Sequence, residues 1–274
     1  MATSARIHIL LARERNYAVI IRRGPSKRVC TIGWDRTNNS FTAGQWLKGK
    51  IYERRSDLSP DGKHMIYFAM NGKWHSETDG SWTAISRAPY LKTVGLWAKG
   101  DCWHGGGLFL TNKTYWINHG YGHRTLTAPH ALREIKDPPF EACYGGECPG
   151  VYFLRLQRDG WQLCQSEKAG KSRSVATFEK KVYSEWTLRK LAIATTDPPE
   201  GKGCYYDEHQ LQNLHSGVVW NFPDWEWAEA DQKGIYWANK GKLFMAAPGI
   251  AGLGEITELH DFNNMQFTPA EAPY

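Results

Sequence analysis

Short apolar runs, each preceded by turn-forming residues, are the main pattern of this chain. The clearest example is the phrase DLSPDGK at residues 57–63, which is followed by the apolar run MIYF at residues 65–68. Pro60 presets its own φ, and the Asp-Gly pair that follows tolerates the left-handed backbone of a tight turn. Four apolar and mostly β-favouring residues after such a turn predict a buried strand.

Comparable runs recur at a nearly constant interval. They begin at residues 18, 65, 108, 151 and 235, so successive starts are 47, 43, 43 and 84 residues apart. The last interval is about twice the others and predicts a sixth, weaker copy near residue 193, where LAIA occupies residues 191–194. A repeat of about 40–45 residues is the length of one four-stranded blade in many β-propellers.

The turn phrase and its strand resemble the repeat of the TolB-like and WD40-like propeller families, whose blades often carry a Ser-Pro-Asp-Gly turn before a buried strand. Residues 227–246, WAEADQKGIYWANKGKLFMA, resemble a second and worn copy. The resemblance implies an all-β fold: a single β-propeller domain over residues 1–274 with four-stranded antiparallel blades. Six blades are expected, or five if the segment at about 170–215 is an insertion. A large β-sandwich with irregular spacing is the alternative.

The sequence also predicts the secondary structure of three further segments. Residues 179–191 have a spacing that fits either an amphipathic helix or a long strand. Residues 128–135, with Thr127 as a candidate cap, predict a short helix. Residues 7–12 are expected to form a strand that pairs with residues 265–267, because a propeller closes its ring to remove exposed strand edges.

Composition narrows the classes of function. The chain has 13 Trp, 13 Tyr and 10 Phe, which suits both sheet packing and binding surfaces. Its formal net charge is +6, but the basic residues are scattered along the chain, which argues against a nucleic-acid partner. No apolar run approaches the about 18–20 residues of a membrane span, and no secretory signal pattern is present. A cytoplasmic protein without a membrane partner is therefore expected, with its six cysteines reduced.

Two motif-like stretches lack the partners that their chemistry requires. Residues 104–107, HGGG, match the oxyanion loop of esterases, but no Gly-x-Ser-x-Gly motif follows them. Residues 169–172, AGKS, end like a phosphate-binding P-loop, but Gln165 stands where that motif needs Gly. Dinucleotide, zinc-protease and kinase motifs are also missing, so no cofactor is expected.

Four residues are candidate metal ligands. Cys143 and Cys148 are separated by four residues, and His119 with His123 could complete a Cys₂His₂ zinc set. Because their order and spacing are atypical of zinc sites, a free-thiol loop is the favoured interpretation and a disulfide is the alternative. No metal is expected.

The region from residue 103 to residue 124 combines aromatic and basic side chains with glycine-rich loops, as a binding rim would. The candidate binding residues are Trp103, His104, Trp116, His119, Tyr121, His123 and Arg124. A surface loop without a ligand is the alternative. A second aromatic patch, DWEW at residues 224–227, is expected to pack between blades.

The absence of a catalytic motif favours a non-catalytic binding or scaffold module. Its expected partner is another protein, in a larger assembly of the bacterial type. The alternative is a hydrolase or lyase with its site in the propeller channel, for which Asp101, His104 and His119 are the first candidates. The sequence predicts neither the identity of the partner nor the oligomeric state.

Overall fold

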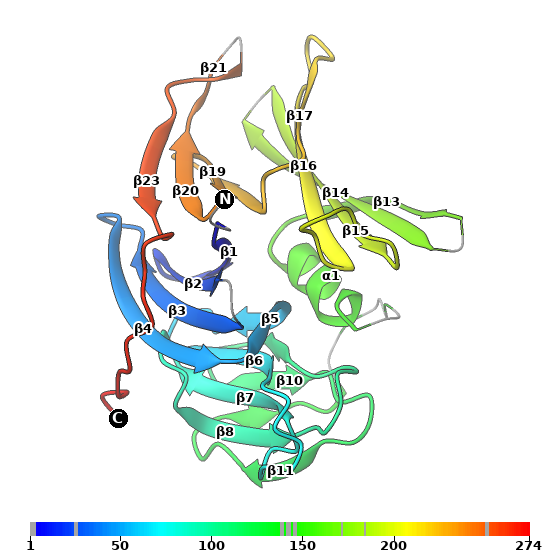
Figure 1. The fold of residues 1–274 in the computed structure, drawn as a ribbon. Coiled ribbons are helices and arrows are strands. Elements are labelled where there is room, and N and C mark those ends of the chain that lie inside the picture. The colour runs from blue at the N-terminus through cyan, green and yellow to red at the C-terminus, as the bar shows by residue number, and fades with distance from the viewer. Residues whose placement is uncertain are drawn as a thin grey trace. The chain divides into compact units, whose positions relative to one another are not determined.

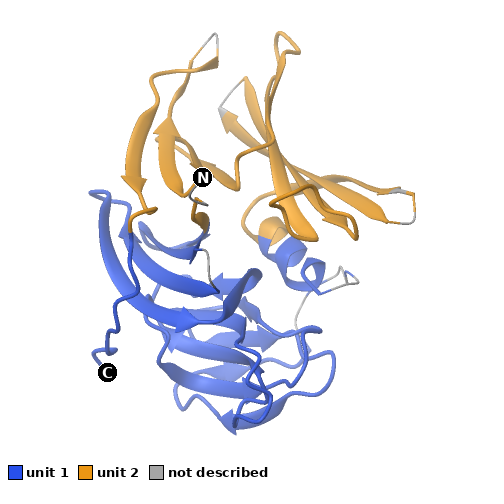
Figure 2. Ribbon diagram, in the orientation of Figure 1, with its two compact units in different colours: residues 1–3, 8–155, 265–274 blue, residues 4–7, 156–264 orange. Residues whose placement is uncertain are grey.

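The computed structural model divides the chain into two compact units, coloured separately in Figure 2. It describes residues 4–24, 27–137, 140, 144, 147–170, 172–183, 185–249 and 252–274. Unit 1 comprises residues 1–3, 8–155 and 265–274, and unit 2 comprises residues 4–7 and 156–264. Both units consist mainly of antiparallel sheets, which confirms the all-β expectation. The extent of a single domain stays a prediction.

Three sheets form among the described residues of unit 1 (Figure 1). Their strand orders are β1-β2-β3-β4, β11-β8-β7-β6-β5 and β12-β10-β9. The bounds are β1 Arg6–Leu11, β2 Tyr17–Gly24, β3 Arg28–Asp35, β4 Ser40–Lys48, β5 Lys50–Leu58, β6 His64–Met70, β7 Ser81–Arg87, β8 Thr93–Ala98, β9 Gly107–Phe109, β10 Thr114–Ile117, β11 Arg124–Thr127 and β12 Arg133–Glu134. The helix α1, Pro149–Arg158, begins in this unit.

The apolar run on β6 is continuous because both of its faces are buried. Met65 and Tyr67 belong to one core cluster, together with Ile21 of β2. Ile66 belongs to a second cluster, together with Phe109 of β9. Successive residues of a strand point to opposite faces, so a strand covered on both sides reads as an uninterrupted apolar run. The sheet that contains β6 is therefore packed between the other two sheets of unit 1.

The turn before β6 forms as the sequence predicts. The Gly62 N–H donates to the Ser59 carbonyl at 2.8 Å, and Gly62 has a φ of 73°, where glycine is favoured. The Ser59 hydroxyl and the Lys63 N–H both donate to Asp61 Oδ1, at 2.7 and 3.1 Å. The Asp61 side chain thus closes the turn from within, which is the usual role of Asp at such a position.

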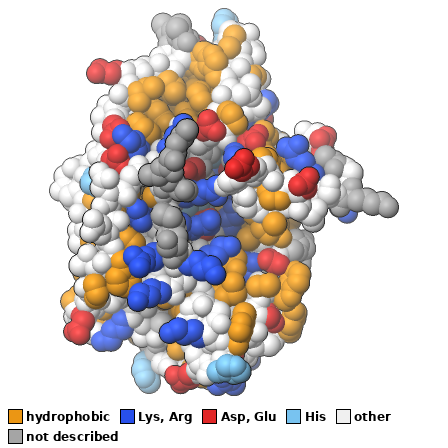
Figure 3. Space-filling view, in the orientation of Figure 1, with side chains coloured by type: hydrophobic (Ala, Val, Ile, Leu, Met, Phe, Trp, Pro, Cys, Tyr) orange, Lys and Arg blue, Asp and Glu red, His pale blue; other side chains and the backbone are white. Residues whose placement is uncertain are grey.

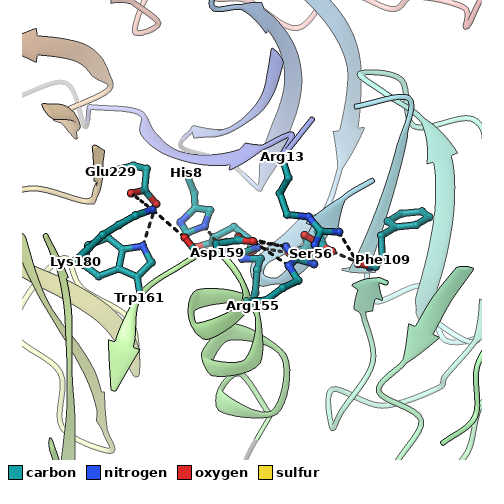
Figure 4. A network of polar contacts seen from close by, with 12 residues as sticks. His8, Arg13, Ser56, Phe109, Arg155, Asp159, Trp161, Lys180 and Glu229 are labelled. Atoms are coloured by element: carbon teal, nitrogen blue, oxygen red, sulfur yellow. Dashed lines mark hydrogen bonds and ion pairs between the residues drawn. The ribbon is translucent and has the colours of Figure 1, made fainter. Parts of the chain in front are cut away.

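A β-bulge in β5 is stabilised by the helix. The register between β5 and β6 shifts between Tyr52 and Asp57, so the residues between them leave the ladder. Arg155 of α1 donates to the carbonyl of Glu53 at 3.1 Å and to the carbonyl of Ser56 (Figure 4). The helix therefore satisfies backbone acceptors that the sheet leaves unpaired.

Unit 2 contains the remaining sheets of the described chain. Their orders are β13-β14-β15-β16-β17, β18-β19-β20-β23 and β21-β22. The bounds are β13 Gln162–Ala169, β14 Arg173–Tyr183, β15 Trp186–Thr195, β16 Tyr205–Asn213, β17 Val219–Phe222, β18 Trp227–Asp231, β19 Gly234–Asn239, β20 Lys242–Ala246, β21 Pro248–Gly249, β22 Gly252–Leu253 and β23 Thr257–Asp261.

A charged cluster and an aromatic stack are built into unit 2. Glu229 of β18 accepts from the indole N–H of Trp161 at 3.0 Å and from the ammonium group of Lys180 at 2.9 Å (Figure 4). Trp225 lies between Phe222 and the ring of Trp237, with centroid distances of 3.9 and 4.7 Å. Trp225 of the 224–227 patch therefore packs against rings of its own unit. The packing of this patch between blades stays a prediction.

Five of the six predicted apolar runs lie in five different sheets, on β2, β6, β9, β15 and β19. The strand predicted at residues 151–154 is wrong, because these residues lie in α1. Pro149 occupies the first helical position, which its fixed φ favours. The Cys148 carbonyl accepts from the N–H groups of Val151 and Tyr152, at 3.2 and 2.9 Å. A run of four apolar residues does not by itself distinguish a strand from a buried helix turn.

Two local predictions are also wrong. Residues 128–135 contain no helix but the two-residue strand β12, and Thr127 ends β11. The N–H groups of Arg133 and Ile135 donate to carbonyls on and beside β10, at 2.8 Å each, so this backbone is satisfied by the sheet. Residues 179–191 form neither one helix nor one strand. They span the β14–β15 hairpin, in which Tyr183 pairs with Trp186.

The expected pairing of the two ends of the chain does not occur. β1 is an edge strand beside β2, as residues 7–12 predict, but residues 265–267 form no strand. Instead, Phe267 packs against Trp46 of β4 with a centroid distance of 5.8 Å. Among the described residues, no helix has the length and hydropathy needed to cross a lipid bilayer.

Candidate functional site

Two loops of unit 1 bring most of the predicted site residues together. Residues 99–106 connect β8 to β9, and residues 118–123 connect β10 to β11. The Gly105 N–H donates to the Asn118 carbonyl, and the Asn118 N–H donates to the Gly106 carbonyl, both at 2.9 Å. We call the surface formed by residues 99–106 and 118–124 the loop surface.

The glycines of the HGGG stretch allow the first of these loops to pass close to β5 and β6. His104, Gly105 and Gly106 have consecutive positive φ values of 55°, 81° and 74°, and glycine adopts such angles without strain. A Cβ on Gly105 would lie 2.4 Å from the Phe68 ring, and one on Gly106 would lie 1.8 Å from the carbonyl oxygen of Arg55. Only glycine fits at these two positions.

The same geometry decides against an oxyanion hole. The Gly106 N–H donates to the hydroxyl oxygen of Thr83 at 2.9 Å, and the Gly105 N–H is bound to Asn118. Both amides are therefore used within the fold and are not presented to a substrate. The HGGG stretch is a structural turn before β9, as the missing nucleophile motif predicts.

His119 is oriented by a carboxylate. Its Nε2 lies 2.5 Å from Oε1 of Glu134, which is on β12. The side chain of His119 is 42% exposed and that of Glu134 is 23% exposed. A partly exposed imidazole held by a carboxylate is a good hydrogen-bonding group for a ligand.

His123 is held in the interior of the same loop. Its Nδ1 lies 3.1 Å from the His119 carbonyl, which can only accept, so Nδ1 carries the proton. Its Nε2 lies 3.0 Å from the Thr83 hydroxyl and accepts from it. Burial, and then the neighbouring His119, lower the pKa of His123 to about 4. His123 is therefore a neutral, structural histidine.

Asp101 is also committed to the fold. Both of its carboxylate oxygens accept from the Lys99 ammonium group at 2.7 Å, and Oδ1 accepts from the Trp103 N–H at 2.8 Å. The Lys99 Nζ lies 4.2 Å from the centroid of the Tyr121 ring. These contacts fix the backbone beneath Trp103 and the ring of Tyr121 together.

The aromatic side chains of the loop surface face solvent. Trp103 is 53% exposed and Tyr121 is 55% exposed. The His104 ring meets the Tyr121 ring edge-on with a centroid distance of 5.5 Å. Arg124, at the end of the surface, forms an ion pair with Asp79 at 2.9 Å.

Trp116 is separate from this group. It lies on β10, and its ring packs against Phe140 with a centroid distance of 5.5 Å. The core cluster beside it contains Leu108 and Val151. Six of the seven predicted binding residues thus lie on the loop surface, and Trp116 instead packs beside the helix.

Sequence reasoning missed three supporting residues. Glu134 lies on the segment for which the sequence predicts a helix. Thr83 lies on β7 and Lys99 follows β8, and neither residue is part of a motif. Their roles depend on pairings between distant segments, for which the sequence has no local signal.

The possible metal ligands predicted from the sequence are not gathered at this surface. Among the described residues, no group of three or more His, Cys, Asp or Glu side chains is arranged to hold a metal ion. Cys143 lies outside the described residues, so the free-thiol loop stays a prediction and the disulfide its alternative. Cys148 itself is a buried free thiol at the start of α1.

Comparison with known proteins identifies no family. No protein-family model and no curated protein matches the chain. Among solved structures, a chain of hydrazine synthase from Kuenenia stuttgartiensis is similar, with a TM-score of 0.31 and 8% identity. The similarity covers 90% of this chain and 78% of that chain. A TM-score this low supports no assignment of function.

Proposed function

We propose that this chain is a non-catalytic protein-binding module and that the loop surface is its binding surface. The observation that carries the proposal is the exposure of two large aromatic side chains, Trp103 and Tyr121, on loops that are fixed by inter-loop hydrogen bonds. Exposed Trp and Tyr side chains on a rigid base are the residues that most often anchor protein interfaces. These side chains lose little conformational entropy on binding, because the backbone that carries them is already ordered. The partner is another protein, within an assembly of several chains.

One observation favours the alternative, a hydrolase or lyase: the carboxylate-oriented imidazole of His119 resembles half of a general-base site. The other two candidates are less suitable for catalysis. Asp101 is neutralised by Lys99, and His104 lies in a tight turn against Gly120. Binding is therefore the better supported function.

We also propose that the sheets are blades of a β-propeller. In support, five predicted runs lie in five sheets of three to five strands each, and consecutive sheets of unit 1 pack face to face. Since the run at residues 151–154 is helical, the number of blades proposed is five. An experimental structure with the sheets arranged around one axis would support this arrangement, and an open stack of sheets would contradict it.

The binding function is tested by comparing the proteins that co-purify with the chain when Trp103 and Tyr121 are present and when both are replaced. The tagged wild-type chain, the double variant Trp103→Ala/Tyr121→Ala, and the control Ile256→Ala are purified from the native host. Ile256 is a matched control because it is also an exposed large apolar side chain, 55% exposed, but lies in unit 2.

We expect one stoichiometric protein partner with the wild type and the control, and its loss from the double variant. With the purified partner, the double variant should bind at least about 30-fold more weakly, the effect of losing one interface hot spot of about 2 kcal/mol. Equal retention by the double variant would show that the loop surface is not the binding surface.

A further inference from the structure

Residues 265–274 lie extended along the surface of unit 1 without joining a sheet. Among the described residues, each hydrogen bond that we find between this segment and the rest of unit 1 involves a side chain. Strand addition would use a row of backbone hydrogen bonds. This segment is instead held at three separate points, a pattern typical of a bound peptide.

Phe267 is the first anchor point. Its ring packs on Trp46 of β4, with a centroid distance of 5.8 Å. Two cations also face the ring: the guanidinium carbon of Arg28 at 5.4 Å and the Nζ of Lys48 at 5.3 Å from its centroid. Cation–π contacts of this kind contribute modestly at exposed sites and favour an aromatic ring at this position.

Gln45 is the second anchor point. Its side-chain amide nitrogen donates to the Ala270 carbonyl at 2.7 Å. Its carbonyl oxygen accepts from the N–H groups of Leu91 and Lys92, at 2.7 and 2.9 Å. The N–H groups of Leu91 and Lys92, in the chain between β7 and β8, thus hold the Gln45 side chain in position. Its amide nitrogen can then donate to a backbone carbonyl of the peptide that lies beside it.

Tyr274 is the third anchor point. Its hydroxyl donates to the Lys92 carbonyl at 2.5 Å and accepts from the Arg87 N–H at 3.0 Å. The Arg87 guanidinium carbon lies 4.8 Å and the Lys92 Nζ lies 5.4 Å from the centroid of its ring. The Lys92 ammonium group also donates to the Tyr274 backbone oxygen.

The charges of this surface are not matched by the segment that covers it. Four cations face the segment, and they are Arg28, Lys48, Arg87 and Lys92. Glu271 is the one acidic side chain of the segment, and it is exposed. Lys and Arg side chains are also visible elsewhere on this face of the chain (Figure 3). A more acidic peptide would complement these cations better.

We propose that this surface of unit 1 is a peptide-binding site, occupied in cis by residues 265–274, whose ligand in trans is an extended acidic peptide of a partner protein. The ligand carries two aromatic side chains seven positions apart, in the spacing of Phe267 and Tyr274. The internal segment acts as a competitor. Its tether gives it an effective concentration of about millimolar, so only a peptide that binds more tightly displaces it. The proposal does not depend on the function of the loop surface.

The test uses full-length chains and labelled synthetic peptides. One chain is the wild type, and the second, Phe267→Ala/Tyr274→Ala, has a released segment. The control chain, Gln266→Ala/Thr268→Ala, alters two exposed and uncharged positions of the segment and leaves both rings and Glu271 in place. The probes are a peptide of the sequence 264–274, an acidic form with glutamates replacing Gln266 and Thr268, and a form with Phe267 replaced by Ala.

We expect the released chain to bind the sequence-matched peptide at least about tenfold more tightly than the wild type or the control chain. The acidic peptide should bind more tightly still, with an affinity that falls as salt is raised. The peptide without Phe267 should bind at least about tenfold more weakly than its parent. Equal binding by the wild-type and released chains, or by the parent and Phe267-less peptides, would overturn the proposal.

A second measurement covers the case in which the released chain does not fold. The NMR resonances of the backbone amides of residues 265–274 are followed on the wild-type chain, with and without saturating acidic peptide. We expect these resonances to sharpen and to move to the positions typical of a disordered chain when the peptide is present, because the segment is displaced. Unchanged resonances would overturn the proposal. The variant Trp103→Ala/Tyr121→Ala should bind the peptides as the wild type does, so the result is independent of the test of the loop surface.

Discussion

The loop surface of unit 1 and the aromatic stack of unit 2 use the same kinds of residue for opposite purposes. In the stack, Trp225 and Trp237 are each about 95% removed from solvent and lie face to face. On the loop surface, Trp103 and Tyr121 are more than half exposed. The tryptophans of this chain therefore occur in two settings, some packed in the interior of the fold and some exposed on its surface.

The two regions also differ in what holds the rings. The stack is held by ring-on-ring contact of Trp225 with Phe222 of β17 and with Trp237 of β19, so each ring contributes to the stability of the fold. The rings of the loop surface rest on a hydrogen-bonded base, in which Asp101 and Thr83 hold the backbone. Removing a ring from the loop surface should leave that base intact, whereas removing a ring from the stack leaves a cavity.

The largest expected effect is the loss of a ring from the stack. Trp237→Ala should lower the free energy of unfolding by about 3–5 kcal/mol, the usual cost of deleting a buried aromatic side chain. Trp103→Ala should change it by no more than about 0.5 kcal/mol, as expected for an exposed side chain. Urea unfolding of both variants measures the difference. Similar losses for the two would show that the rings are not used differently.

The next effect concerns the base of the loop surface. Gly106→Ala places a Cβ against a backbone carbonyl at a positive φ, so we expect a loss of about 2–3 kcal/mol. The matched control is Gly72→Ala, which has a similar φ of 72° but nothing within 4 Å of the added Cβ. The control should lose only about 1 kcal/mol. Equal losses would mean that the close approach of Gly106 to the Arg55 carbonyl of β5 does not matter for stability.

The sequence predicts those parts of the fold that a single stretch of chain encodes. The turn at residues 59–62 and the run on β6 are local patterns, and both are formed as predicted because a single stretch of chain encodes them. The helix α1 was missed because four apolar residues fit both periods, and its decisive signal is Pro149. The hairpin at residues 179–191 was missed because its turn lies in the middle of a pattern that was read as one element.

The candidate site was predictable only in part for the same reason. Aromatic and histidine residues close together in sequence lie together in the fold, so the loop surface could be anticipated. Trp116 could not be assigned correctly, because the face of β10 that it occupies depends on where α1 packs. The contacts of His119 with Glu134 and of Phe267 with Trp46 join distant segments, and no local pattern encodes them.

The smallest expected effect is a pH dependence that arises from His123. Because the folded chain holds the pKa of His123 at about 4, below its ordinary value of about 6.5, the unfolded chain binds more protons between these values. Stability is therefore fully present above about pH 6.5 and is lost as the pH falls toward 4, by on the order of 2 kcal/mol. His123→Gln should be less stable at pH 7 but should lose less on acidification. The measurement is urea unfolding at pH 7, 5.5 and 4.5 for the wild type, this variant and the exposed control His215→Gln, which should follow the wild type. If His123→Gln shows the full acid sensitivity of the wild type, then a neutral His123 does not stabilise the backbone beneath the loop surface. The hydrogen-bonded loop surface would then differ less from the aromatic stack in what stabilises it.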